Sequence, residues 1–232
     1  MFLPCVFGIL AGKCLCNQDS LLGGDDSSSI SIQALFPIDP GIKWRYERTS
    51  SEGDSHYVTH VKGAASIGDR VYYILANPFG VSYYELTPEM LVLKGIAPSE
   101  EPENVSFYEE GKMIRLKTPL RKGTRWEDKA TLILTDTTIL SSYRTEIRGW
   151  EKVDVPAGTF DAIVTSSTLN TAFIDSKSEL GKGAITMEQV WYSPGTGVVR
   201  RANYLIYGKD QTIPVRDDKL EEFTREGQNK IK

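Results

Sequence analysis

The chain has 232 residues, of which 40% are hydrophobic and 25% are charged, values typical of a folded protein with a sizeable core. The net charge of −4 and an isoelectric point near 5.4 give no general attraction to nucleic acid or to anionic lipid. The longest basic clusters are pairs such as Arg121-Lys122, so we expect no nucleic-acid partner.

The N-terminal segment, residues 1–16, is predicted to be a signal-peptide leader. It holds all three cysteines, Cys5, Cys14 and Cys16, so a disulfide framework or a cysteine-based zinc site in the rest of the chain is excluded. Residues 2–12 form an apolar run that has the length of a secretion-signal core. It is shorter than the roughly 20 residues that a membrane-spanning helix needs.

A small-residue stretch followed by cysteine resembles the lipobox of bacterial lipoproteins, which is cleaved before a cysteine that then carries acyl chains. Cys14 and Cys16 are the candidate lipidation sites, and their spacing does not separate them. Lys13 and Leu15 depart from the small residue expected before that cysteine, and no basic residue precedes the apolar run. A signal peptide without lipid, or a frayed apolar N-terminus, is the alternative. Residues 17–35, rich in Ser, Gly and Asp, are predicted to be a flexible tether.

The rest of the chain, residues 36–226, is predicted to be a single β domain. From Ile42 to Glu47 apolar and polar residues alternate, which is typical of a strand with one buried face. Turns rich in glycine and proline then separate further apolar stretches. The predicted strands of this first half cover residues 42–49, 57–61, 71–75, 81–86 and 90–93.

The second half is predicted to follow the same rhythm after a surface loop over residues 95–110. The predicted strands cover residues 112–117, 126–134, 142–150, 162–165, 186–192 and 198–207, and residues 153–160 with Pro156 and Gly158 are predicted to form a tight hairpin. Residues 170–183 are polar and indicate an inserted loop or a weak hairpin. The stretch that begins at Asp217 fits a short helix or an edge strand equally well.

One motif occurs twice, Pro-x-x-x-Gly-x-x-Trp, and ends at Trp44 and at Trp126. The order of strands and turns after each copy is similar, which predicts two meander repeats over residues 36–96 and 118–207. The alternative is that any antiparallel meander shows such a rhythm. The fold class that follows is mostly all-β, a curved antiparallel sheet or half-barrel built from two meander repeats.

A family resemblance rests on this motif and on two later stretches. Residues 155–162 read VPAGTFDA, and residues 191–199 read WYSPGTGVV. Together they resemble a group of uncharacterised bacterial envelope proteins and lipoproteins with a curved antiparallel sheet, distantly similar to lipoprotein-carrier half-barrels. The resemblance implies a fold and an envelope address, and it carries no catalytic residue.

No pattern in the sequence indicates catalysis. His56 and His60 are the only histidines, and on a strand their spacing puts them about 13 Å apart, too far to share one metal ion. The sequence has no Gly-x-Ser-x-Gly motif and no phosphate-binding glycine loop after a strand. We therefore expect no enzyme activity, no metal and no cofactor.

Aromatic residues are the candidate binding residues. A curved sheet offers a concave apolar face on which Trp44, Tyr46, Trp126, Trp150 and Trp191 could hold an apolar ligand. The alternative is that these rings fill the core, as large aromatics commonly do in β-sheets.

The function predicted from these features is that of a non-catalytic lipoprotein of the bacterial cell envelope that binds a hydrophobic ligand or lipoprotein-like cargo. A lipid anchor at the N-terminus would hold it to the periplasmic side of a membrane or to the cell surface. The alternative is an interaction module that docks another envelope protein through an open sheet edge or face.

Overall fold

The computed structural model describes residues 30–98, 105–175, 178–207 and 211–225, and the side chains of residues 175–182 are left out. Strands account for 77% of the structure, and the one helix is short. The elements, in chain order, are α1 (Ile32–Leu35), β1 (Lys43–Ser50), β2 (Gly53–Ile67), β3 (Arg70–Asn77), β4 (Gly80–Leu86), β5 (Met90–Ala97), β6 (Ser106–Gly111), β7 (Met113–Lys117), β8 (Arg125–Ile133), β9 (Thr137–Val155), β10 (Gly158–Asp175), β11 (Ser178–Ser193), β12 (Gly197–Tyr207) and β13 (Gln211–Thr224). No helix in the described ranges is long and apolar enough to cross a membrane.

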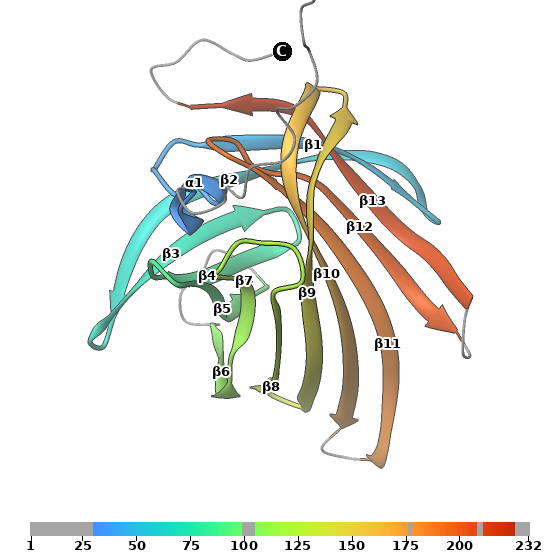
Figure 1. Ribbon diagram of the computed structural model, residues 1–232. Coiled ribbons are helices and arrows are strands. Elements are labelled where there is room, and N and C mark those ends of the chain that lie inside the picture. Colours follow the sequence, from blue (N-terminus) through green and yellow to red (C-terminus); the bar gives the residue numbers. More distant parts are fainter. Residues whose placement is uncertain (1–29, 99–104, 176–177, 208–210, 226–232) are drawn as a thin grey trace, which may run out of the picture.

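The strands form one antiparallel sheet that closes on itself as a 12-strand barrel (Figure 1). Strands β8 to β13 follow one another in order, and β13 then pairs with β1. Pairing of β4 with β5, of β5 with β6 and of β6 with β8 completes the ring. Among the described strands, β7 is the one that is not part of this ring. It pairs with the first residues of β5, Met90–Leu93.

The prediction of an all-β, antiparallel fold is confirmed, and the prediction of a half-barrel built from two meander repeats is wrong. The sheet closes because β13 bridges the two ends of the chain and β5 joins β4 to β6. The two meanders also differ in shape. Strands β1 to β5 have at most 15 residues, whereas β9, β10 and β11 have 19, 18 and 16.

Several predicted loops are strands or helix instead. Residues 30–35 of the predicted tether belong to the fold instead, because Ile32 and Leu35 of α1 are fully buried in the barrel, and residues 17–29 lie outside the described part. The predicted loop over residues 95–110 contains the end of β5 and most of β6, with residues 99–104 outside the described part. The polar stretch 170–183 continues β10 and β11, since its backbone bonds to β9 and across the hairpin. The segment after Asp217 lies in β13, between two strands and away from any edge.

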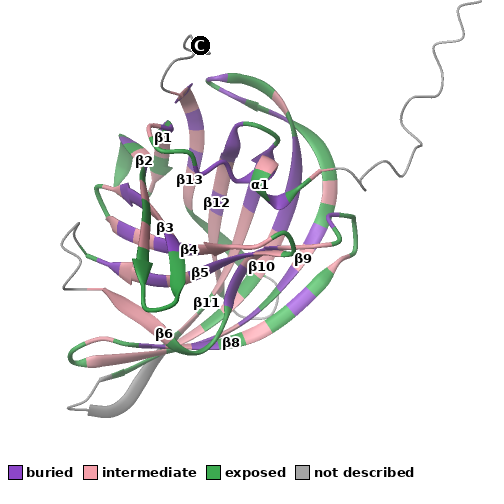
Figure 2. Cartoon of the chain, turned by 90° about the vertical axis from the view of Figure 1, so that its left-hand side faces the viewer, coloured by how far each residue is buried: buried purple, intermediate pink, exposed green. Residues whose placement is uncertain are grey.

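The barrel interior holds the main hydrophobic core, and α1 lies within it (Figure 2). Alternation along the strands sends every second side chain inward. A second, smaller cluster lies on the outer side of β3, β4 and β5. Its members pack under Phe107 and are Tyr72, Ala76, Val81, Tyr83 and Ala97.

Two of the three stretches that carry the family resemblance meet in space. The indole nitrogen of Trp44, at the end of the first tryptophan motif, donates a hydrogen bond to the carbonyl of Thr196 at 2.5 Å. Gly197 follows with a φ of 93°, and a Cβ there would lie 3.3 Å from the Trp44 nitrogen. Glycine therefore suits both the backbone conformation and the close approach of the ring. The next strand, β12, starts at this point.

Candidate ligand-binding site

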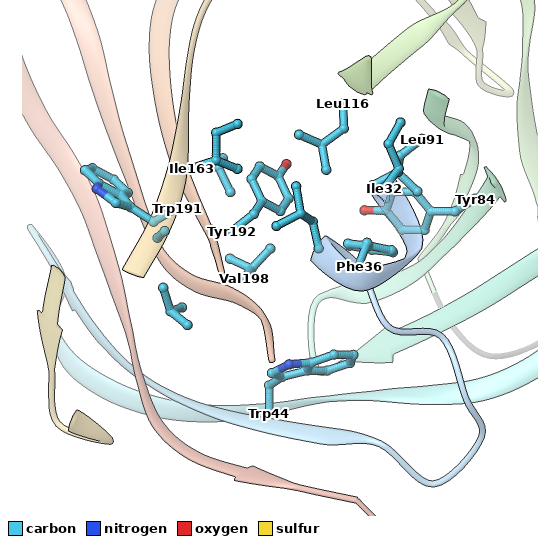
Figure 3. Close-up of a cluster of buried hydrophobic side chains, with 14 of the residues drawn as sticks. Ile32, Phe36, Trp44, Tyr84, Leu91, Leu116, Ile163, Trp191, Tyr192 and Val198 are labelled. Carbon is cyan, nitrogen blue, oxygen red and sulfur yellow. The ribbon is translucent and has the colours of Figure 1, made fainter. Parts of the chain in front are cut away.

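The barrel contains a partly open cavity of about 170 Å³ between the first four strands and the last two. Its lining is mainly aromatic and apolar, with a cluster of charged groups on one side. The residues are Phe36, Trp44, Tyr46, Arg48, Tyr57, Thr59, Leu75, Asn77, Phe79, Ser82, Tyr84, Val198, Arg201, Arg216 and Asp218. The core cluster that borders it is drawn in Figure 3, where Phe36 from the end of α1 lies close to Tyr84.

Hydrogen bonds and ring contacts fix the aromatic wall of the cavity. The rings of Tyr46 and Tyr57 stack with centroids 5.3 Å apart. The Tyr46 hydroxyl donates to the carbonyl of Val198 at 2.7 Å, which ties β1 to the start of β12. Burial raises the pKa of Tyr46 well above its ordinary value and that of Tyr57 to about 12, so both hydroxyls are neutral at physiological pH.

Phe79, in the turn between β3 and β4, forms the solvent-facing part of the lining and is 59% exposed. Its ring meets Tyr57 edge to face at 5.3 Å. The Arg48 guanidinium lies over both rings, 4.1 Å from the Phe79 centroid and 4.5 Å from the Tyr57 centroid. Such cation–π contacts hold this exposed ring in place at the cavity.

The charged side of the cavity is centred on Asp218, which is only 1% exposed. Arg48 donates to both of its carboxylate oxygens, at 2.7 and 3.4 Å. Arg216 also faces this carboxylate, with Nε 3.3 Å from Oδ2, and its Nη2 donates to the side-chain oxygen of Asn203 at 3.0 Å. The fork-shaped pairing with Arg48 is the stronger interaction, because its geometry is bidentate.

A second acid, Glu188, lies beside the cavity and pairs with two further arginines. Arg115 of β7 donates to it at 3.0 Å, and Arg201 Nε lies 3.5 Å from its other oxygen. Burial alone would raise the pKa of Glu188, but Arg115, Arg201 and Arg216 together hold it below the ordinary value. Glu188 is therefore ionised, and β7 crosses close enough to the opposite strands to reach it.

Comparisons with known proteins give a fold likeness and no family. No family model matches the chain, and no curated protein matches it in sequence. One similar solved structure is a candidate exported protein with a YmcC-like fold from Bacteroides fragilis, at 15% identity and a TM-score of 0.49, covering 82% of this chain and 98% of its own. Another is a candidate lipoprotein from Parabacteroides distasonis, at 18% identity with the same TM-score and coverage. Likeness at this level says nothing about what the chain binds.

Two of the five predicted binding residues, Trp44 and Tyr46, line the cavity. The other three do not. Trp126 is buried elsewhere in the core, where its indole nitrogen donates to the carbonyl of Ile114 at 3.1 Å. Trp191 points away from Tyr192 in Figure 3, donates to Glu151 at 2.7 Å and lies under Arg200. Trp150 is 38% exposed.

The remaining predicted site residues lie apart from the cavity. Cys14 and Cys16 are outside the described residues. His56 is half exposed, and its Nδ1 lies 2.9 Å from a Glu221 oxygen that also accepts from Arg45. Within the described ranges no group of three or more His, Cys, Asp or Glu could hold a metal ion.

The charged residues of the site are not among those predicted from the sequence. One signal was present, because Arg48 continues the inward series of Ile42, Trp44 and Tyr46 at every second position. The facing strand gave no such signal. The register of β13 against β1 shifts between Arg45 and Tyr46, so the inward position of Asp218 depends on a bulge that the sequence does not mark.

Proposed function

We propose that this protein is a non-catalytic protein of the bacterial cell envelope that holds a hydrophobic ligand in its barrel. The observation that carries the proposal is the cavity, which is walled by the rings of Trp44, Tyr46, Tyr57 and Tyr84 and is entered beside Phe79. Concave, largely apolar lining with a few convergent polar groups is the usual form of a small-molecule site.

The cavity volume restricts the ligand. Cavities that enclose drug-sized ligands measure roughly 300–1,000 Å³, and an engineered cavity of about 150 Å³ holds benzene. At about 170 Å³ the cavity of this barrel has room for one ring or a short alkyl chain. The ligand is therefore a small molecule or the end group of a longer one, and a complete lipid or a lipoprotein-like cargo would leave most of its length outside.

Native mass spectrometry and organic extraction of the purified protein test this proposal. A co-purifying small molecule is expected in the wild type and in Ser51→Trp, which adds an indole on an exposed turn. Ser82 lines the cavity, so Ser82→Trp fills it and is expected to lose the molecule while keeping the far-UV circular dichroism of the fold. Equal retention by both variants would contradict the proposed site.

The envelope address rests on the leader, with Cys14 or Cys16 as the acylated residue. Labelling of the intact chain with radiolabelled palmitate is expected in the wild type. Loss of label in only one of Cys14→Ala and Cys16→Ala would identify the anchor. An unlabelled wild type would end the lipid-anchor proposal and leave the ligand proposal standing.

A second function, a module that docks another envelope protein, is favoured by one outer surface. Ile133, Leu140, Ile174 and Ile185 are 39–45% exposed, and the strand register places them on the same face of β8 to β11. Contiguous exposed apolar side chains of this kind mark interaction surfaces. Barrel closure removes most of the open sheet edge predicted for this role, so the face is the remaining candidate. Ile174→Lys is expected to abolish co-purification of a partner without affecting ligand retention.

A further inference from the structure

Arginines outnumber carboxylates around the cavity. Arg48, Arg201 and Arg216 line it, and among the described lining residues Asp218 is the one carboxylate. Arg115 and Glu188 behind this layer add one charge of each sign, so the positive excess remains. An uncompensated charge in a protein interior is costly unless something pairs with it.

Two of the three lining arginines make fewer hydrogen bonds than the third. Arg48 is satisfied by its bidentate bonds to Asp218. Arg216 and Arg201 approach carboxylates only at 3.3 and 3.5 Å, and the Nε of each is buried and donates no hydrogen bond to any described residue. The Arg216 and Arg201 side chains are 30% and 28% exposed, and both residues line the cavity.

Arg201 and Arg216 occupy diagonal positions on neighbouring strands. Arg201 is paired with Asp218 across β12 and β13, and Asn203, two residues further along β12, is paired with Arg216. Burial lowers the pKa of Arg216, and the charges of Arg201 and Arg48 lower it further against the opposing effect of Asp218. Three guanidinium groups and one carboxylate leave the cavity wall with a net positive charge, a setting that favours an anion.

We infer that the ligand carries an anionic group, a carboxylate or a phosphate monoester, that binds to Arg201 and Arg216. Guanidinium groups suit both anions, because their planar donors match two oxygens at once. The apolar part of the ligand would lie against Tyr46, Tyr57 and Leu75. The inference rests on the proposed function, since it specifies the ligand of the same cavity.

Calorimetric titration of the purified full chain with four probes tests the inference. Hexanoate and hexyl phosphate carry the anion on a short alkyl chain, hexanamide is the neutral isostere of hexanoate, and inorganic phosphate has no alkyl chain. Charge-assisted hydrogen bonds predict at least about tenfold tighter binding of the two anionic alkyl probes than of hexanamide. The tighter of the two identifies the head group.

The other outcomes separate the inference from the function on which it rests. Equal binding of hexanoate and hexanamide would overturn the anion site and leave the hydrophobic pocket standing. Equal binding of inorganic phosphate and hexyl phosphate would keep the anion site and contradict a hydrophobic ligand. No binding of any probe would overturn both.

Variants locate the anion. Arg216→Gln is expected to weaken hexanoate at least about tenfold and to leave hexanamide unchanged. Arg144→Gln is the matched control, since Arg144 is 72% exposed on the outer face and paired with Glu127. Equal loss in both variants, or loss of hexanamide together with hexanoate in Arg216→Gln, would contradict a direct contact with the anion.

Discussion

Two parts of the barrel interior differ, although the same alternating strands build both. Around β7, β8 and β9 the interior is packed, with Ile114, Trp126 and Tyr143 joined by hydrogen bonds between their side chains and backbone. Between β1 to β4 and β12 to β13 it is open and charged. The buried side chains of β7 fill the first of these two regions. Closure of the sheet alone therefore does not leave a cavity. The cavity lies where polar side chains point inward and no extra strand of the described residues fills the space.

The packed region is expected to dominate stability. Trp126→Ala removes a ring that is 6% exposed, together with its hydrogen bond to Ile114, and should cost about 3–5 kcal/mol of unfolding free energy. Trp150→Ala removes a ring that is 38% exposed and should cost less than about 1 kcal/mol. Urea unfolding followed by circular dichroism measures both. Similar losses of unfolding free energy in the two variants would contradict the difference in burial between Trp126 and Trp150.

The ion pair at the cavity is expected to come next. Arg48→Gln leaves the Asp218 carboxylate, 1% exposed, without its bidentate partner, and should destabilise the fold by about 3 kcal/mol. Adding Asp218→Asn removes the stranded charge and should recover much of the loss. A double variant that is as unstable as the sum of the single variants would show that the pair is not coupled.

Alkaline pH probes a tyrosine in each region. The pKa values of Tyr57, in the cavity, and Tyr143, in the packed region, are raised to about 12, in both cases mainly by burial. A raised pKa favours the neutral phenol in the fold, so this stabilisation is complete below pH 10 and is lost as the pH rises to 12. Each tyrosine should lose about 2 kcal/mol of its contribution to the free energy of unfolding over this range. Absorbance titration should show late ionisation that Tyr57→Phe and Tyr143→Phe each reduce; normal titration near pH 10 would contradict their burial.

The smallest effect on stability is expected at Arg216. In the absence of ligand, Arg216→Gln removes a partly desolvated charge and leaves the bidentate pair of Arg48 with Asp218 in place, so the free energy of unfolding should change by less than about 1 kcal/mol. Thermal unfolding of ligand-free protein measures it against Arg48→Gln. A loss as large as that of Arg48→Gln would assign Arg216 a structural role.

Local patterns in the sequence predict much of the fold, and long-range pairing explains what they miss. The alternation from Ile42 to Glu47 predicts β1, and the turn residues before Gly158 predict the β9–β10 hairpin, where Gly158 has a φ of 130°. Closure depends on β13 reaching β1 and on β5 sharing its edge between β6 and β7. The pairing of β1 with β13 joins residues far apart in the chain, and the choice of partner for each part of β5 is likewise not reported by a local period.

The sequence predicts part of the aromatic lining of the candidate site but not its arginines, again because long-range pairing decides where side chains lie. Aromatic residues are conspicuous in the sequence, and Trp44 and Tyr46 do line the cavity. Trp126 and Trp191 have the same appearance and are buried elsewhere, because which region a ring fills depends on its strand neighbours. In the sequence Arg201 and Arg216 cannot be told from surface arginines, because their position at the cavity depends on the pairing of β12 with β13 and of β13 with β1.

Quenching of tryptophan fluorescence by 6-bromohexanoate tests the central claim most directly, since of the four tryptophans only Trp44 lines the cavity. Saturable quenching is expected in the wild type and in Trp150→Phe, and it should disappear in Trp44→Phe. Quenching that persists in Trp44→Phe, or that never saturates, would contradict a ligand site inside the barrel.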